Sequence, residues 1–164
     1  MGNFAAGGKV RLIGVGNILL KDEGIGVRVA EELKKKHWPP SVEVIDGGVA
    51  GFGLIDFFLE STKVFLIDAA DMNLPPGTIR RFAADAIRLQ EEAPKLSMHE
   101  VSLLEVLGIT RALDSSPREI IIIGIQPKEI SGGMELTPEL QAVVPKVIEM
   151  VLKELEKDGI HPLN

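Results

Sequence analysis

The chain has 164 residues, the length of one domain that can bury a core of its own. It contains no cysteine, which excludes disulfides, thiolate metal sites and a cysteine nucleophile. The formal net charge is −6, so a nucleic-acid partner is not expected. No apolar run reaches the length of a membrane span, and we expect a cytoplasmic protein without membrane insertion.

Strand and helix patterns alternate through the first half of the chain. In order, they predict a strand at 10–15, a helix at 23–36, a strand at 41–46, a short helix at 54–60 and a strand at 63–68. Glycines are frequent in the loop after the first strand and in the turn after the second. Such alternation is typical of a parallel sheet whose strands are joined by helices.

The second half continues the pattern with a strand at 78–82, a helix at 99–107 and a strand at 119–125, while residues 83–98 show no clear pattern. Thr137 is a good N-cap for the last helix, because Pro138 follows it at the first helical position. Gly159 is expected to end that helix.

The expected strands are nearly continuous in apolar residues, as strands covered on both faces are. We therefore predict an α/β domain, a three-layer sandwich with a mostly parallel twisted sheet of about five strands and helices on both faces. One domain is expected over residues 1–164, with a flexible N-terminus at 1–8. Ligand sites in such sheets lie beyond the carboxyl ends of the strands.

Acidic residues stand at these strand ends. Asp22 and Glu23 end the loop after the first strand, Asp46 follows the second strand and Asp68 ends the third. Each has an ordinary structural explanation, since acids in a first helical turn complement the helix dipole and an Asp after a strand can close an Asx-turn. Taken singly, these explanations are favoured.

A histidine adds a second interpretation. His99 stands at the start of a predicted helix, and two strand-end carboxylates with one imidazole would form an open site for a borderline divalent ion if they converged. The spacing does not establish that convergence. The chain has neither the H-E-x-x-H of a metalloprotease helix nor the G-x-S-x-G of a serine hydrolase. A dinucleotide site is not expected, because Leu19 replaces the third glycine of G-x-G-x-x-G.

Five segments, in order, resemble the signatures of the hydrogenase maturation endopeptidases. They are GVGNILLKDEGIG at 14–26, DGG at 46–48, LIDAADM at 66–72 with PGTIR at 76–80, SMHEV at 97–101, and GIQP at 124–127. One such motif is weak, whereas five in order over nearly the whole chain are specific. The stretches 68–80 and 124–127 are most similar to the branch that serves formate-hydrogenlyase-type hydrogenases.

The resemblance implies an endopeptidase that removes the C-terminal extension from the nickel-loaded precursor of a [NiFe]-hydrogenase large subunit. It implies that Glu23, Asp68 and His99 complete the coordination of a nickel ion that the substrate carries and the enzyme does not hold permanently. Asp46 matches an acid of the family signature. We predict Asp68 and Asp46 as catalytic residues, since either carboxylate is a candidate for a general base. Members of the family are catalogued as aspartic-type peptidases, and we expect a monomer.

The way in which the peptide bond breaks stays open at this point. Nickel would act as a Lewis acid or lower the pKa of a bound water, or else a carboxylate would serve as general base while nickel only positions the chain. Two other functions compete with this one. A non-enzymatic α/β module would sense nickel or dock without cutting, and a general metallohydrolase would keep its own metal through dialysis. A protein substrate also predicts an exposed apolar surface, which the sequence does not locate.

Overall fold

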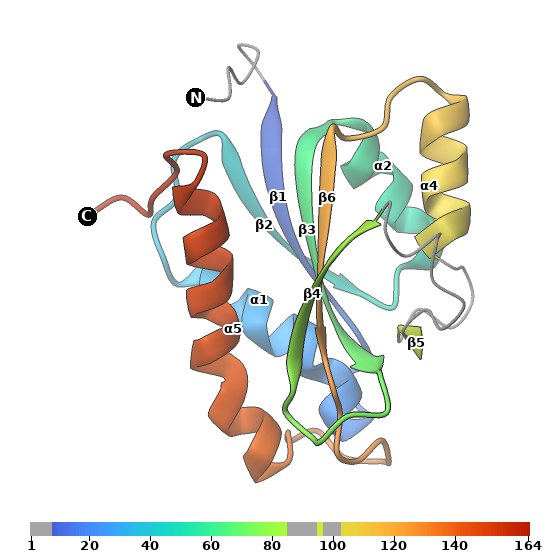
Figure 1. Ribbon diagram of the computed structural model, residues 1–164, viewed down its shortest axis with the longest axis vertical. Coiled ribbons are helices and arrows are strands. Elements are labelled where there is room, and N and C mark those ends of the chain that lie inside the picture. Colours follow the sequence, from blue (N-terminus) through green and yellow to red (C-terminus); the bar gives the residue numbers. More distant parts are fainter. Residues whose placement is uncertain (1–7, 85–94, 97–102) are drawn as a thin grey trace.

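The computed structural model describes residues 8–84, 95–96 and 103–164. Within these residues a six-stranded sheet forms the middle layer, and helices cover both of its faces (Figure 1). The strands are β1 (Lys9–Val15), β2 (Val42–Gly48), β3 (Ser61–Asp71), β4 (Ile79–Ala83), β5 (Lys95–Leu96) and β6 (Glu119–Ile125). The predicted three-layer α/β architecture is confirmed.

The sheet is parallel apart from two short additions. Its order is β2-β1-β3-β6-β4, with β1 parallel to β2 and β3, and β3 parallel to β6. β4 pairs antiparallel with β6 at the edge, and β5 pairs antiparallel with the end of β3. The strands β2, β1, β3 and β6 therefore end at the same edge of the sheet, where ligand sites of this architecture lie.

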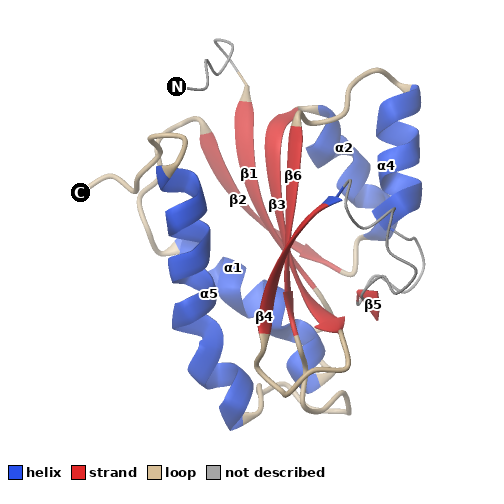
Figure 2. Cartoon of the chain, in the orientation of Figure 1, coloured by secondary structure: helices blue, strands red, loops and turns tan. Residues whose placement is uncertain are grey.

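The helices divide into two layers. α1 (Ile25–Lys34) and α5 (Pro138–Glu156) cover one face of the sheet, whereas α2 (Leu54–Leu59) and α4 (Leu103–Ala112) cover the other (Figures 1 and 2). A short 3-10 helix, η1 (Lys21–Gly24), leads into α1, and another, η2 (Gly51–Gly53), leads into α2. No helix in the described part of the chain has the length and apolar character of a membrane span.

The side chains of β3 alternate between two apolar cores. Phe65 and Ile67 pack with α1 and α5, while Val64 and Leu66 pack with α2 and α4. All four are fully buried, because β3 lies between β1 and β6 and has helices on both faces. This explains why the sequence of β3 is continuously apolar and shows no period of two.

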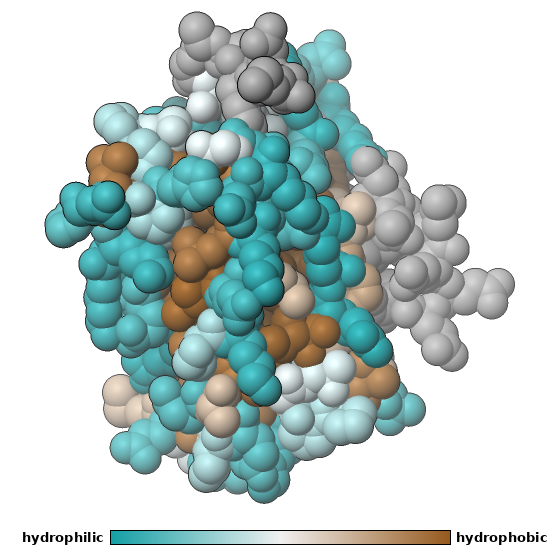
Figure 3. Space-filling view, turned by 60° about the vertical axis from the view of Figure 1, so that its left-hand side comes forward, coloured by the Kyte–Doolittle hydropathy of each residue, from teal (hydrophilic) through white to brown (hydrophobic). Residues whose placement is uncertain are grey.

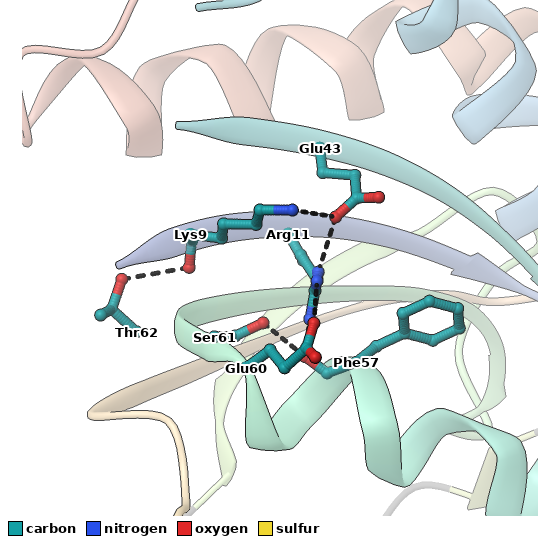
Figure 4. A network of polar contacts seen from close by, with 7 residues as sticks. All are labelled: Lys9, Arg11, Glu43, Phe57, Glu60, Ser61 and Thr62. Atoms are coloured by element: carbon teal, nitrogen blue, oxygen red, sulfur yellow. Dashed lines mark hydrogen bonds and ion pairs between the residues drawn. The ribbon is translucent and has the colours of Figure 1, made fainter. Parts of the chain in front are cut away.

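Arg11 fixes α2 to the amino-terminal part of the sheet. Its guanidinium group, which is 3% exposed, donates hydrogen bonds to Glu43 of β2 at 2.9 Å and to Glu60 at 2.9 Å (Figure 4). It also donates to the carbonyl oxygen of Phe57 at 2.7 Å. A planar fork of donors can satisfy three acceptors in different directions, which an ammonium group does less well.

Lys63 has a similar role on the other face. Its ammonium group is buried and lies 2.6 Å from Asp158, just beyond α5, and 2.8 Å from Glu119 of β6. Burial alone would lower the pKa of Lys63, but the bonds to Asp158 and Glu119 outweigh it and raise the pKa. The pair of carboxylates thus holds a charged lysine inside the protein.

The boundaries of several elements differ from their predicted positions. The first helix takes α geometry only at Ile25, because residues 21–24 form η1. The third strand runs on to Asp71, where β5 pairs with it. The helix predicted at 99–107 overlaps α4, but residues 97–102 lie outside the described residues, as does the N-terminus predicted to be flexible except for Gly8.

The start of α5 matches the prediction in position and differs in chemistry. Thr137 is the N-cap and Pro138 is the first helical residue, and Gly159, with a φ of +71°, follows the end of the helix. The hydroxyl group of Thr137 does not cap its own helix, however. It donates to the carboxylate of Asp22 at 2.9 Å, which joins α5 to a loop more than a hundred residues earlier in the chain.

Candidate functional site

The carboxyl ends of the parallel strands bring two of the predicted site residues to one level of the sheet. Gly14 of β1 lies opposite Asp46 of β2 and also opposite Ile67 of β3. Asp68 follows Ile67 and lies opposite Gly124 of β6. Two strand spacings therefore separate Asp46 from the end of β3, a distance of roughly 10 Å between backbones.

The backbone of η1 and α1 lies directly on these strand ends. A Cβ atom at Gly26 would come within 3.0 Å of the carbonyl oxygens of Ile67 and Val15. A Cβ at Gly16, where φ is +137°, would come within 3.0 Å of the carbonyl oxygen of Glu23. Because only glycine permits both the conformation and the approach, the glycines of segment 14–26 bring Glu23 and η1 against β3.

Both of the acids predicted to bind metal are buried. The exposed fraction is 1% for Glu23 and zero for Asp68. The alternation of β3 directs Asp68 to the same face as Leu66, the face covered by α2 and α4. Acidic side chains are seldom fully buried, and these two lie in adjoining segments at the carboxyl edge of the sheet. The structure brings their two segments together, and joint binding of one ion stays a prediction.

His99, the third predicted ligand, lies outside the described residues. The described chain resumes at Leu103, where α4 begins on the face toward which Asp68 is directed. Among residues 8–84, 95–96 and 103–164, no group of three or more His, Cys, Asp or Glu side chains is arranged to hold a metal ion. A three-ligand site built on Glu23 and Asp68 therefore requires a residue such as His99 from outside that set.

Asp46 closes an Asx-turn at the end of its strand, which is the ordinary structural explanation that its position suggested. Its side chain is exposed, and its Oδ1 accepts a hydrogen bond from the backbone N–H of Gly48 at 2.9 Å, which closes an Asx-turn. Gly48 has a φ of +46° in that turn. The neighbours at alternate positions, Val42 and Val44, pack with α1 and α5, so Asp46 and Asp68 are directed to opposite faces of the sheet. A catalytic role for Asp46 stays a prediction.

Asp22 is the site residue whose role the sequence did not reveal. It is fully buried, and its carboxylate accepts hydrogen bonds from the backbone N–H groups of Lys128 at 3.0 Å and Glu129 at 2.9 Å. It also accepts from the N–H of Thr137 at 2.8 Å and from its hydroxyl group. Asp22 therefore serves the loop after β6 instead of capping its own helix. No local pattern links residues 22 and 137, so no sequence signal was available.

Gln126 explains the fifth signature segment. The amide oxygen of Gln126 accepts hydrogen bonds from the backbone N–H groups of Met72 at 2.7 Å and Leu74 at 3.2 Å. Its amide nitrogen donates to Asp71 at 3.3 Å. One nearly buried side chain at the end of β6 thus fixes the loop that follows β3, close to Asp68.

Exposed apolar side chains gather in the loops at this edge. Among the described residues, the large hydrophobic side chains exposed after β1, β2 and β6 are Leu19, Val49, Phe52, Ile130 and Met134. An open pocket of about 450 Å³ adjoins Met134, between Arg28 of α1 and Gln141 of α5. Figure 3 shows a different face, on the side where α5 lies in Figure 1, and there too apolar side chains show in gaps between hydrophilic ones. The predicted apolar surface thus has candidates at the carboxyl edge.

Comparison with known proteins places these features in a family. A family model described as hydrogenase maturation protease matches residues 27–154. The chain is 36% identical over 155 residues to the hydrogenase expression/formation protein HupD of Thiocapsa roseopersicina, covering 93% of this chain and 70% of that protein. It is 32% identical to the hydrogenase 2 maturation protease of Escherichia coli K12, covering 94% of this chain and 95% of that protein.

A solved structure agrees with the sequence comparisons. The hydrogenase maturating endopeptidase HybD from E. coli superimposes with a TM-score of 0.85 at 31% identity, over 94% of this chain and 96% of that one. Fold and sequence thus point to the same proteins, although the branch predicted from residues 68–80 and 124–127 stays a prediction. The chain belongs to the hydrogenase maturation protease family, and it is a peptidase of that family.

Proposed function

We propose that this peptidase removes the C-terminal extension from the nickel-loaded precursor of a [NiFe]-hydrogenase large subunit and uses the bound nickel as its signal to cut. The observation that carries the proposal is the burial of Glu23 and Asp68 in adjoining segments at the carboxyl edge of the sheet. The printed names of the relatives, which include a hydrogenase 2 maturation protease, support the substrate class.

In this proposal Glu23, Asp68 and His99 complete the coordination of the nickel ion that arrives on the precursor. Carboxylate oxygens with an imidazole nitrogen suit a borderline divalent ion. The glycines at 16 and 26 support this arrangement, because they let the backbone carrying Glu23 lie on the end of β3. The metal is therefore part of the substrate, and an enzyme without precursor has no need to retain it.

Bond cleavage would follow from nickel acting on the scissile carbonyl or on a water, or from a carboxylate acting as general base. Asp68 is better supported as that base than Asp46, because Asp46 is exposed, closes a turn and is directed to the other face. The aspartic-type assignment, action as a monomer and a cytoplasmic location are also parts of the proposal. Sedimentation would test the oligomeric state, and cell fractionation would test the location.

The direct test is an incubation of the purified protein with the matching large-subunit precursor, prepared with and without nickel. Loss of mass at the precursor's C-terminus, read by intact-mass spectrometry, is expected only with nickel. Asp68→Asn, Glu23→Gln and His99→Ala should abolish it, because each removes one ligand without a large change in volume at the two acids. Trimming of the nickel-free precursor at the same rate would leave a peptidase and refute the nickel signal.

Asp46→Asn serves as the comparison variant. If Asp46 only closes a turn, the asparagine oxygen can still accept from Gly48, and trimming should stay near that of the wild type. A loss of turnover as large as that of Asp68→Asn would instead establish Asp46 as a second catalytic acid.

A further inference from the structure

The loops that follow β1 and β6 are joined along their length. Lys21 donates its backbone N–H to the carbonyl oxygen of Gly133 at 2.8 Å, and Gly133 donates to the carbonyl oxygen of Leu19 at 2.9 Å. The ammonium group of Lys21 lies 2.5 Å from the carboxylate of Glu129. These contacts are at the surface, and each is modest alone.

The buried centre of this junction is Asp22. Its two oxygens receive three backbone N–H groups and one hydroxyl group, and all four donors belong to residues 128–137. A carboxylate that accepts this many bonds away from water is held tightly in one position, and so are the groups that donate to it. Asp22 therefore fixes the loop after β6 relative to η1.

The junction lies beside the candidate site. Its two loops follow β1 and β6, the strands on either side of β3, and η1 itself contacts β3. Asp68 lies near the carboxyl end of β3, and Glu23 is the residue that follows Asp22. The joined loops carry Leu19, Ile130 and Met134, and each of these side chains is more than half exposed.

We propose that Asp22 is a positioning residue, which locks residues 17–22 and 127–137 into one rigid platform that holds Glu23 in place and receives the precursor through Leu19, Ile130 and Met134. This inference rests on the proposed function, since the precursor is its partner. Asp22 itself touches neither the nickel nor the scissile bond. Its loss should weaken binding of the nickel-loaded precursor and leave the cleavage step nearly unchanged.

The substitution Asp22→Asn tests whether Asp22 joins the two loops, and it changes the shape of the side chain very little. Asparagine places an NH₂ donor where one carboxylate oxygen stood, and both oxygens of Asp22 accept from donors, so either orientation sets a donor against a donor. Thr137→Val is the milder second variant, because it removes only the hydroxyl donor and leaves the backbone N–H bonds. It keeps the proposal testable if Asp22→Asn folds poorly.

The first readout is hydrogen–deuterium exchange of the backbone amides of Lys128, Glu129 and Thr137, which needs no substrate. In Asp22→Asn these amides should exchange about tenfold faster or more, because they lose a charged acceptor. Exchange at the wild-type rate would overturn the proposal, since the loops would then be joined without Asp22.

The second readout is steady-state trimming of the nickel-loaded precursor. Asp22→Asn should raise KM about tenfold and Thr137→Val about threefold, with kcat within about twofold of wild type. The double variant should fall short of the product of the two effects, because both act through one contact. A loss confined to kcat, or full multiplication of the two effects, would overturn the positioning role.

Lys63→Met is the matched control, because it disrupts a buried charged cluster at the far end of the sheet. Each variant is assayed at a temperature the same number of degrees below its own Tm. Under that condition the KM of Lys63→Met should equal the wild-type KM. An equal rise in KM for Lys63→Met would mean that the effect of Asp22→Asn comes from a general loss of stability, and it would overturn the inference. If the wild type itself does not trim the precursor, the proposed function fails, and the exchange rates still decide whether Asp22 joins the two loops.

Discussion

Gly26→Ala should displace the first helix from the strand ends. The new methyl group would lie within 3.0 Å of two backbone carbonyl oxygens, on Ile67 and on Val15, and neither can move as a flexible side chain would. Overpacking a rigid site costs about 1–3 kcal/mol and sometimes more, and contact with backbone on two strands places this case at about 3 kcal/mol. For a domain of this size that corresponds to a fall in Tm of roughly 6–12 °C.

Gly108→Ala is the matched control for this change. Gly108 lies inside α4, and a Cβ there would meet nothing within 4 Å, so alanine should stabilise the protein by about 0.5–1 kcal/mol through helix propensity. Urea unfolding monitored at the single tryptophan, Trp38, would measure both variants. The reasoning is refuted if Gly26→Ala unfolds within about 0.5 kcal/mol of the wild type.

Three further outcomes follow from contacts away from the scissile-bond chemistry. Arg11→Lys keeps the charge, but an ammonium group cannot reach three acceptors in different directions. The free energy of unfolding, measured in urea, should fall by about 1–2 kcal/mol, a figure already reduced because the two carboxylates are exposed to solvent. An unchanged free energy of unfolding would contradict this. The raised pKa of Lys63 means that its stabilisation is present below the pKa of an unfolded lysine, about 10.4, and is lost as pH rises through the higher pKa of the folded state. Wild-type Tm should therefore fall more steeply above that pH than the Tm of Lys63→Met, and parallel curves would refute it. Gln126→Leu should speed amide exchange at Met72 and Leu74 about tenfold, measured by mass spectrometry of peptides covering 71–77, and unchanged protection would show that Gln126 does not fix that loop.

The fold was predictable because its signals are local. Continuous apolar strands such as β3 and β6 indicate a sheet covered on both faces, and the Thr137-Pro138 pair marks a helix start within one residue. The boundaries of elements that depend on tertiary contacts were harder to predict from the sequence. The first two residues of the predicted helix, 23 and 24, belong to the 3-10 turn η1, in which Asp22 accepts hydrogen bonds from a loop far away in the sequence.

The candidate site divides in the same way. The position of Glu23 and Asp68 near strand ends follows from the strand pattern, and their burial was not predictable from residue type, since acids are seldom buried. Segment 14–26 was informative through its acids, whereas the structure shows that its glycines matter as well, because Gly16 and Gly26 allow the backbone to approach. The joining of two loops by Asp22 depends on contacts between residues far apart in the chain, which one sequence does not encode as a pattern.

The central claim is that buried acids at the carboxyl edge recognise nickel on the precursor. The most direct measurement is the dissociation constant of the complex with precursor that carries nickel and with precursor that lacks it, for the wild type and for Asp68→Asn. The account predicts tighter binding with nickel for the wild type by about tenfold or more, and no difference for Asp68→Asn, because a lost metal ligand removes the distinction. Equal affinity of the wild type for both forms would contradict the account.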